Sequence, residues 1–137
     1  MSIEANKAVV QRYLEMWDTG NLDIADEVLS PDFVDHTRPH QAPGIEGVKE
    51  NIDTFRRGFP DATHTVIHMI GEGDIVAFRF ARRGRHKGMF AGFPPTGKEI
   101  VLTGADFLRI ADGRIIELWS SQDGLSLAQQ LGISIGG

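Results

Sequence analysis

The hydrophobic pattern of the chain changes once, from helical spacing to strand alternation. In residues 3–18 the apolar side chains recur every three or four positions, which is typical of an amphipathic helix. Residues 45–58 repeat this spacing, and residues 22–29 predict a shorter helix between the two. A last helical turn is expected over 126–131, where Gly132 ends the pattern.

From residue 63 onward the apolar period is two, as in half-buried strands. The pattern predicts strands over 63–70 and 75–86 and a hairpin within 93–119, and residues 33–36 are expected to form a short extended piece. Consecutive strands with short turns favour antiparallel pairing, and separate helices and strands favour an α+β fold. We expect N-terminal helices packed on a curved, mostly antiparallel sheet that forms a cone with an internal pocket.

One acidic residue interrupts an apolar strand face in the predicted hairpin. Side chains alternate along a strand, so the even positions from Ile100 to Ile110 share a face, and Asp106 is the only charged residue among them. A carboxylate among aliphatic side chains is unfavourable unless it is paired or takes up a proton. Asp106 is therefore our first candidate for acid–base chemistry, and a structural ion pair with an arginine is the alternative.

The partner of Asp106 depends on the turn of the hairpin. A three-residue loop, Ala111–Gly113, places Leu118 opposite Asp106 and turns Trp119 outward. A two-residue turn would instead place Trp119 opposite Asp106, because a slip of one residue exchanges the two faces. We favour the three-residue loop. On this register the inner face of the second strand carries Ile116, Leu118 and Ser120.

Composition and charge narrow the functional classes. The 137 residues are 41% hydrophobic, so we expect one folded domain over residues 1–137. A net charge of −5 argues against nucleic-acid binding, and the lack of cysteine excludes disulfides and thiolate nucleophiles. There is no long apolar run and no signal-type N-terminus, so we expect no membrane contact and a cytoplasmic location.

Two histidines could assist Asp106. His36 follows the short extended piece, and His86 ends a predicted strand on the side of its inward positions. Imidazole suits proton transfer near neutral pH. A surface histidine or a hydrogen-bonded core histidine is the alternative for each.

Metal binding is not expected from the histidine and acid spacings. His64 and His68 share a strand face but stand roughly 13 Å apart along it. Asp35, His36 and His40 could form a cluster of ligands on a loop. The proline between the two histidines disfavours a helix that would align them as a pair of metal ligands. We therefore expect neither a metal nor an organic cofactor.

Two further patterns are interpreted as structural. Gly92–Lys98 nearly matches a phosphate-binding loop, but Glu99 replaces the Ser or Thr and two prolines remove N–H donors. We expect a rigid turn there, followed by a strand. The basic run Arg82–Lys87 is expected to be a solvated strand end that could attract an anionic group of a ligand.

Bulky side chains of the helices and of the proline-rich loop are expected to line the pocket together with polar positions nearby. The expected substrate-binding residues are Trp17, Asp35, Phe55, Phe59, Met89, Phe90, Phe93, Leu118 and Ser120. Trp119, if it points outward, is a candidate anchor for a dimer interface.

Four segments and the end of the last helix carry a family resemblance. They are residues 31–36 (PDFVDH), 84–90 (GRHKGMF), 92–98 (GFPPTGK), 109–115 (RIADGRI) and 130–132 (QLG). With these motifs nearly the whole chain resembles the SnoaL-like polyketide (ester) cyclase family of the nuclear-transport-factor-2-like superfamily. The resemblance implies an α+β cone around a pocket that binds a small molecule, often in a homodimer through the outer face of the sheet.

The resemblance also implies a reaction type and three site positions. Ring-closing members use acid–base chemistry on a carbon next to a carbonyl, without metal or cofactor. Their proton-transferring aspartate corresponds to Ser120, their histidine on the preceding strand to Asp106, and their pocket asparagine to Asp35.

We therefore predict a small cofactor-independent acid–base enzyme that acts on a small hydrophobic carbonyl compound. The reaction would be of the cyclase, isomerase, dehydratase or hydrolase type. The alternative is a non-catalytic small-ligand-binding or protein-interaction module of the same fold. The serine at position 120 favours this alternative.

Overall fold

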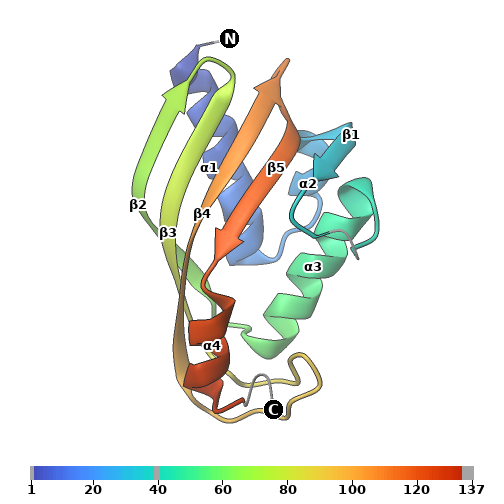
Figure 1. The fold of residues 1–137 in the computed structure, drawn as a ribbon. Helices are drawn as coiled ribbons and strands as arrows, with labels where there is room; N and C mark the ends of the chain where they lie inside the picture. Colours follow the sequence, from blue (N-terminus) through green and yellow to red (C-terminus); the bar gives the residue numbers. More distant parts are fainter. Residues whose placement is uncertain (1, 39–40, 134–137) are drawn as a thin grey trace.

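The computed structural model describes residues 2–38 and 41–133, which contain four helices and one five-stranded sheet (Figure 1). His40, which the sequence offers as a possible but disfavoured metal ligand with Asp35 and His36, lies outside the described residues. In chain order the elements are α1 (Ile3–Thr19), α2 (Ile24–Val28), β1 (Leu29–Asp35), α3 (Gly44–Gly58), β2 (Thr63–Glu72), β3 (Ile75–Arg85), β4 (Glu99–Ala111), β5 (Arg114–Gln122) and α4 (Gly124–Leu131).

The strands form one mixed sheet that does not close on itself, in the order β1-β5-β4-β3-β2. The pairs β2–β3, β3–β4 and β4–β5 are antiparallel, and β1 runs parallel to β5. In Figure 1 helix α1 crosses behind the sheet, while α3 lies beside it on the same side as β1. The expected α+β class with a mostly antiparallel sheet is confirmed.

Helix α1 follows from its amphipathic pattern and its two caps. The Ser2 Oγ accepts a hydrogen bond from the Ala5 N–H, and Gly20 ends the helix in the left-handed region with φ of 76°. The buried stripe includes Tyr13 and Trp17, which are 2% and 6% exposed. Burial of this stripe against β2 and β3 places both aromatic side chains over the inner face of the sheet.

Strand β1 is longer than the short extended piece expected over residues 33–36. It starts at Leu29 and pairs with the C-terminal strand, with Asp35 opposite Leu118. Pro31 interrupts the apolar pattern of this segment, so the local sequence does not predict the full length of the strand. Parallel pairing with a strand about eighty positions later cannot be read from local periodicity.

The β4–β5 hairpin has a register that differs from both expected registers. A tight turn at Asp112 and Gly113, with φ of 51° and 77°, pairs Ile110 with Ile115, and a bulge follows because Arg109 pairs with Glu117. Asp106 is therefore opposite Ser120, and neither Leu118 nor Trp119. A two-residue turn alone would pair even-numbered residues of β4 with odd-numbered residues of β5. Because β5 contains one extra residue at the bulge, even-numbered residues of the two strands face each other again beyond it.

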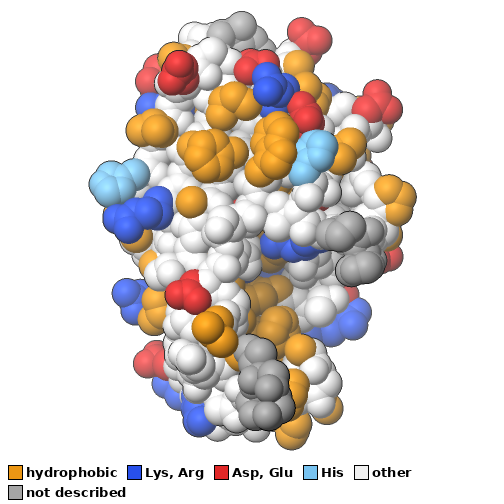
Figure 2. Space-filling model, viewed as in Figure 1, with side chains coloured by type: hydrophobic (Ala, Val, Ile, Leu, Met, Phe, Trp, Pro, Cys, Tyr) orange, Lys and Arg blue, Asp and Glu red, His pale blue; other side chains and the backbone are white. Residues whose placement is uncertain are grey.

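The bulge also decides which β5 side chains face the core. Ile115 is buried at 0% exposure in place of the expected Ile116, and Leu118 follows it at 2%. Trp119 pairs with Phe107 on the opposite, outer face. Figure 2 views this outer face, where hydrophobic side chains group over the upper part of the sheet. None of the described helices combines the length and the apolarity needed to cross a membrane.

Candidate active site on the inner face of the sheet

The carboxyl group of Asp106 lies in the protein interior, on the inner face of β4. The residue is 8% exposed, and in the described part of the chain its Oδ1 has no hydrogen-bond partner. Burial raises the pKa of this carboxyl, while hydrogen bonding by Ser120 and the positive charges of Arg82 and Arg38 lower it. Because burial is the largest of these effects, the pKa lies above the ordinary range for aspartate.

Two neighbouring strands position the Asp106 side chain. Phe78 of β3 is its partner on one side and Ser120 of β5 is its partner on the other. Side chains of direct cross-strand partners start about 4.5–5.5 Å apart, so Ser120 presents its hydroxyl beside the carboxyl group. The acid therefore stands on the rigid centre of the sheet.

A buried arginine is the second charged group of the interior. Arg82 of β3 is 5% exposed, and its guanidinium carbon lies 4.5 Å from the ring centre of Trp17 and 4.6 Å from that of Phe55. Burial lowers the pKa of Arg82 to about 10, against the opposing effects of Tyr13 and Asp106. Cation–π contacts of this kind contribute about 0.5–2 kcal/mol each, which offsets only part of the desolvation cost of a buried cation.

Arg82 is held at one edge by a histidine that is itself held by an aspartate. The Arg82 Nε–H donates to His64 Nε2 over 2.9 Å, and His64 Nδ1 lies 2.7 Å from Asp18 Oδ1. The same Asp18 oxygen accepts the His64 backbone N–H. Because Nε2 accepts from Arg82, the ring proton of neutral His64 sits on Nδ1 and is donated to Asp18.

Three more residues complete the polar group around Asp106. The pKa of the Tyr13 phenol is raised above its ordinary value, mainly by burial and also by the charge of Asp106. Arg38 Nη1 donates to Asp35 Oδ2 over 2.9 Å, and Asp35 Oδ1 accepts the Thr37 N–H. We call the set Tyr13, Asp35, Arg38, Arg82, Asp106 and Ser120 the inner polar cluster.

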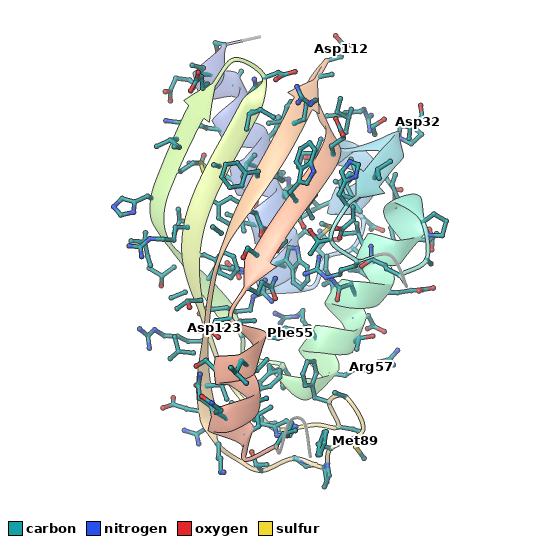
Figure 3. The ribbon with its side chains drawn as sticks, in the orientation of Figure 1. Asp32, Phe55, Arg57, Met89, Asp112 and Asp123 are labelled. Carbon is teal, nitrogen blue, oxygen red and sulfur yellow. The ribbon has the colours of Figure 1, made fainter. Side chains whose placement is uncertain are left out.

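A row of aromatic rings extends from Arg82 along α3. Trp17 and Phe55 meet edge to face at 6.3 Å between ring centres, and Phe55 stacks on Phe59 at 4.9 Å. Phe90 packs against both phenylalanines at 5.8 and 5.1 Å. Figure 3 shows Phe55 between α3 and α4. These expected pocket residues therefore form one continuous apolar wall beside the inner polar cluster.

Met89 and Phe93 lie apart from this wall. They are 60% and 41% exposed, and Met89 lies at the far end of the loop between β3 and β4 (Figure 3). The bridge between Phe90 and Phe93 closes this loop, and it directs Phe90 inward while its partner stays at the surface.

The structure does not bring either candidate histidine to Asp106. His36 stacks on Trp119 with 4.9 Å between ring centres, and its Nε2 lies 2.8 Å from Glu117 Oε2, which places it on the outer face. His86 is fully buried at the other end of β3, where its Nδ1 accepts the Thr96 N–H and its ring stacks on Phe59. Eight strand positions, roughly 26 Å, separate His86 from Phe78, the partner of Asp106.

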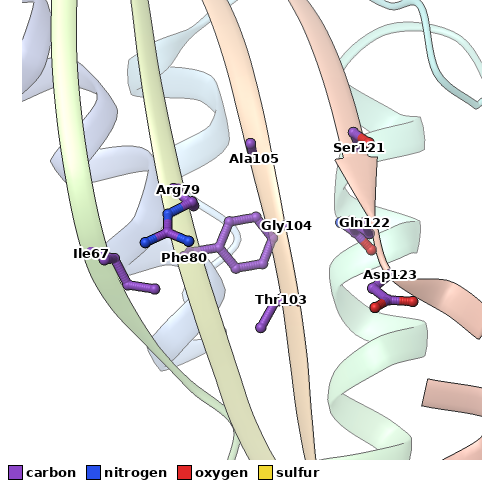
Figure 4. A pocket seen from close by; sticks show the side chains of 9 residues that line it. All are labelled: Ile67, Arg79, Phe80, Thr103, Gly104, Ala105, Ser121, Gln122 and Asp123. Atoms are coloured by element: carbon purple, nitrogen blue, oxygen red, sulfur yellow. The ribbon is translucent and has the colours of Figure 1, made fainter. Parts of the chain in front are cut away.

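Several cavities lie near the sheet, and two of them matter because of their position relative to the site. One of about 370 Å³ lies on the outer face, among Arg79, Thr103 and Ser121 (Figure 4). Another of about 430 Å³ lies between the loop after β1 and α3, where Arg38 and Asn51 contribute to its lining. Because Arg38 belongs to the inner polar cluster, this second cavity adjoins the cluster. The space-filling view also shows a recess between α4 and α3 with hydrophobic side chains on its floor (Figure 2).

Sequence reasoning missed Arg82, Tyr13 and Arg38. Arg82 was expected in a solvated basic run, which is wrong for this residue, although Arg83 and Arg85 are exposed. Its even position beside Phe78 and Phe80 is the same parity signal that identified Asp106, and it was available in the sequence. Arg38 lies in a loop, where no periodicity gives its direction. Within residues 2–38 and 41–133, no group of three or more His, Cys, Asp or Glu side chains is arranged to hold a metal ion.

The structure is an α+β fold with an acid buried between helices and a curved sheet, and comparison with known proteins identifies the family. The family model described as SnoaL-like polyketide cyclase matches residues 7–131, so the chain belongs to the SnoaL-like polyketide cyclase family.

One curated protein and two solved structures are examples of similar proteins. The aklanonic acid methyl ester cyclase DauD of Streptomyces sp. (strain C5) is 29% identical over 132 residues, which cover 90% of this chain and 80% of that protein. The structure of IdmH from Streptomyces antibioticus is 33% identical, with a TM-score of 0.82 over 93% of this chain and 99% of that chain. TsrD from Streptomyces laurentii is 25% identical, with a TM-score of 0.90 over 98% and 99% of the two chains.

Proposed function

We propose that this protein is a cofactor-independent acid–base enzyme that closes a ring in a small hydrophobic carbonyl compound. The observation that carries this proposal is the Asp106 carboxyl, which is buried on the inner face of the sheet with Oδ1 unpaired among the described residues. Membership of the cyclase family supports the reaction type.

Asp106 would act first as a base and then as an acid. Its carboxylate takes a proton from the carbon next to a carbonyl group, and the C–H electron pair moves into an enolate. The enolate carbon attacks a second carbonyl of the same molecule, which forms the ring bond and leaves an alkoxide. The protonated Asp106 returns its proton to this alkoxide, so the carboxylate is regenerated. A pKa raised by burial suits this double role, because proton transfer is most effective when the pKa approaches the working pH.

Asp106 would take the role of the acid that this chain lacks at position 120. The two positions are direct partners on neighbouring strands, so a carboxyl group at 106 reaches nearly the same space as one at 120. The Ser120 hydroxyl supports the ionised form of Asp106 by hydrogen bonding. We infer that the acid of this pocket has moved by one strand.

The substrate would bind next to the aromatic wall and the inner polar cluster. The apolar wall of Trp17, Phe55, Phe59 and Phe90 suits the flat rings of an aromatic polyketide, and entry past Arg38 would use the cavity that adjoins the cluster. DauD is a cyclase of aklanonic acid methyl ester, so this ester and smaller aromatic polyketide esters are the first compounds to assay.

The test measures the rate of product formation from such esters in a single turnover, for the wild type and for two variants. Asp106→Asn should reduce ring closure at least about 10²-fold while the fold is retained. Asp112→Asn, which changes an exposed aspartate at the tip of the same hairpin, should leave the rate unchanged (Figure 3). Undiminished turnover by Asp106→Asn would overturn the proposal, and ligand binding without turnover by the wild type would favour the non-catalytic module.

We further propose that the protein forms a homodimer through the outer face of the sheet. Phe107 is 51% exposed there and pairs with Trp119 across the β4–β5 ladder. Hydrophobic side chains group on this face (Figure 2), and aromatic residues of this kind are frequent anchors of protein interfaces.

A further inference from the structure

Arg82 carries a positive charge in the interior that the described residues leave only partly compensated. Its guanidinium lies against the ring faces of Trp17 and Phe55, and its Nε–H donates to His64. Within residues 2–38 and 41–133, no carboxylate forms an ion pair with it, and His64 is its only hydrogen-bond partner. A guanidinium presents its N–H donors in a fixed planar fork, so the remaining donors are available to a ligand.

The surroundings of Arg82 fix its orientation. His64 accepts the Nε–H over 2.9 Å, and the opposite side of the imidazole is tied to Asp18 over 2.7 Å. Asp18 belongs to α1, His64 to β2 and Arg82 to β3, so three packed elements hold the chain of contacts. A cation that is fixed in place before the ligand arrives requires no reorganisation when charge develops nearby.

We propose that Arg82 binds the enolate oxygen that forms when Asp106 removes the neighbouring proton, and that Asp18 and His64 are positioning residues for this contact. This inference rests on the proposed function and names the electrophilic partner of its base. The ligand class is a compound with a planar oxyanion conjugated to a carbon–carbon double bond.

The movement of charge supports this assignment. Before proton transfer one negative charge lies on the Asp106 carboxylate, and after transfer the carboxyl is neutral and the charge lies on the substrate oxygen. Arg82 and Asp106 extend from the inner face of the neighbouring strands β3 and β4, where Arg82 pairs with Leu102 and Asp106 with Phe78, and the charge of each shifts the pKa of the other. The same cation therefore acts on the negative charge before and after the step, together with Arg38, whose charge also acts on Asp106.

A stable enolate tests the inference without turnover. Dimedone, a cyclic 1,3-diketone, is an enolate anion at neutral pH, and its methyl enol ether has nearly the same shape but no charge. The protein contains no cysteine, so dimedone cannot react with an oxidised thiol. Isothermal titration calorimetry of both compounds at pH 7.5 should show that the wild type binds the enolate at least about tenfold more tightly, a preference worth roughly 1.4 kcal/mol.

Variants assign this preference to the guanidinium. Arg82→Gln should abolish the preference, whereas Arg83→Gln, which removes the exposed neighbouring charge on β3, should retain it. If Arg82→Gln does not fold, as judged by circular dichroism, Arg82→Lys decides, because it keeps the charge but loses the fork and should lower the preference severalfold. Equal binding of the two compounds by the wild type, or a preference that survives in the Arg82 variants, would overturn the inference.

The positioning role has its own readout. His64→Leu removes the acceptor of the Arg82 Nε–H and should weaken enolate binding without changing affinity for the methyl ether. His64→Gln, which keeps a side-chain oxygen, should restore part of the preference. A purely structural role would instead weaken both compounds alike in His64→Leu.

The outcomes separate this inference from the proposed function. Asp106→Asn removes the base and a nearby negative charge, so it should eliminate ring closure yet bind the enolate at least as tightly as the wild type. If Asp106→Asn turns over normally while the enolate preference still depends on Arg82, only the proposed function fails. If Asp106→Asn is inactive and the preference does not depend on Arg82, only the inference about Arg82 fails.

Discussion

Asp106 and Ser120 are direct partners across the β4–β5 ladder, with the carboxyl group and the hydroxyl on the same inner face of the sheet. The tight turn and the bulge of the hairpin together create this pairing. It places the acid of this chain one strand away from the position that the family resemblance gives to the catalytic aspartate.

A carboxyl group should support ring closure from position 106 on β4 or from position 120 on β5. Asp106→Asn alone is expected to lose at least about 10²-fold in ring closure, because the base is gone. Adding Ser120→Asp to this variant returns a carboxyl group to the facing position and should recover at least tenfold, measured as the single-turnover rate with an aromatic polyketide ester. The double variant Asp106→Asn, Ser120→Asn is the matched control. No recovery in a folded Asp106→Asn, Ser120→Asp protein would contradict the idea that the two positions share one reacting space.

Asp106 should limit stability at neutral and alkaline pH. Burial raises the folded-state pKa above the unfolded value, so the favourable contribution of this group is present in acid and is lost as the pH rises through the folded pKa. Asp106→Asn cannot ionise, and it should therefore be more stable than the wild type at pH 8 by ~1–3 kcal/mol.

Urea unfolding between pH 4 and pH 8 measures this effect. The gain of Asp106→Asn should shrink toward the acid end, as the pH falls through the folded pKa and the wild-type carboxyl takes up its proton. Asp112→Asn, at the exposed tip of the hairpin, should give the wild-type pH dependence. A constant gain at every pH would show that ionisation of Asp106 is not its cause.

His64 should produce the opposite pH dependence. Burial lowers the pKa of His64, the contact with Asp18 opposes this effect, and the charge of Arg82 reinforces it. The folded pKa lies below the unfolded value, so the stability contribution is present above the unfolded pKa near 6.5 and is lost as the pH falls through the folded pKa.

His64→Gln should therefore flatten the stability profile between pH 7 and pH 5. The lost slope is at most about 1.4 kcal/mol per pH unit, the limit for one proton. His68→Gln, which changes the exposed histidine of the same strand, should keep the wild-type slope. Thermal unfolding across this pH range gives the comparison, and an unchanged slope in His64→Gln would mean that other groups control it.

The outer face of the sheet should be a dimer interface. Phe107→Glu places a charge in the centre of the exposed aromatic pair with Trp119 and should raise the dimer dissociation constant at least about thirtyfold, or ~2 kcal/mol. Sedimentation velocity over a concentration series provides the measurement. Arg57→Glu, on the exposed surface of α3, should leave the association unchanged. A wild-type protein that sediments as a monomer at all concentrations would refute this interface.

The local pattern of the sequence determined the elements and identified the central acid. Amphipathic spacing and capping residues predicted α1 and α3, and period-two alternation predicted strands β2 to β5, because burial of one face repeats with the geometry of the backbone. The same parity placed Asp106 on the inner face, and it applies equally to Arg82. Arg82 also begins a run of basic residues at the end of a strand, where solvent exposure is the usual outcome, so the local sequence gives two opposing indications for this residue.

The tertiary structure decided which side chains meet. One extra residue in β5 made Ser120 the partner of Asp106, and parallel pairing of β1 brought Asp35 and Arg38 to the inner polar cluster. Stacking on Trp119 directed His36 to the outer face. These outcomes depend on strand register and on contacts between segments far apart in the chain. Local periodicity determines the face of a residue within its own element, and only packing of the elements against one another determines its neighbours.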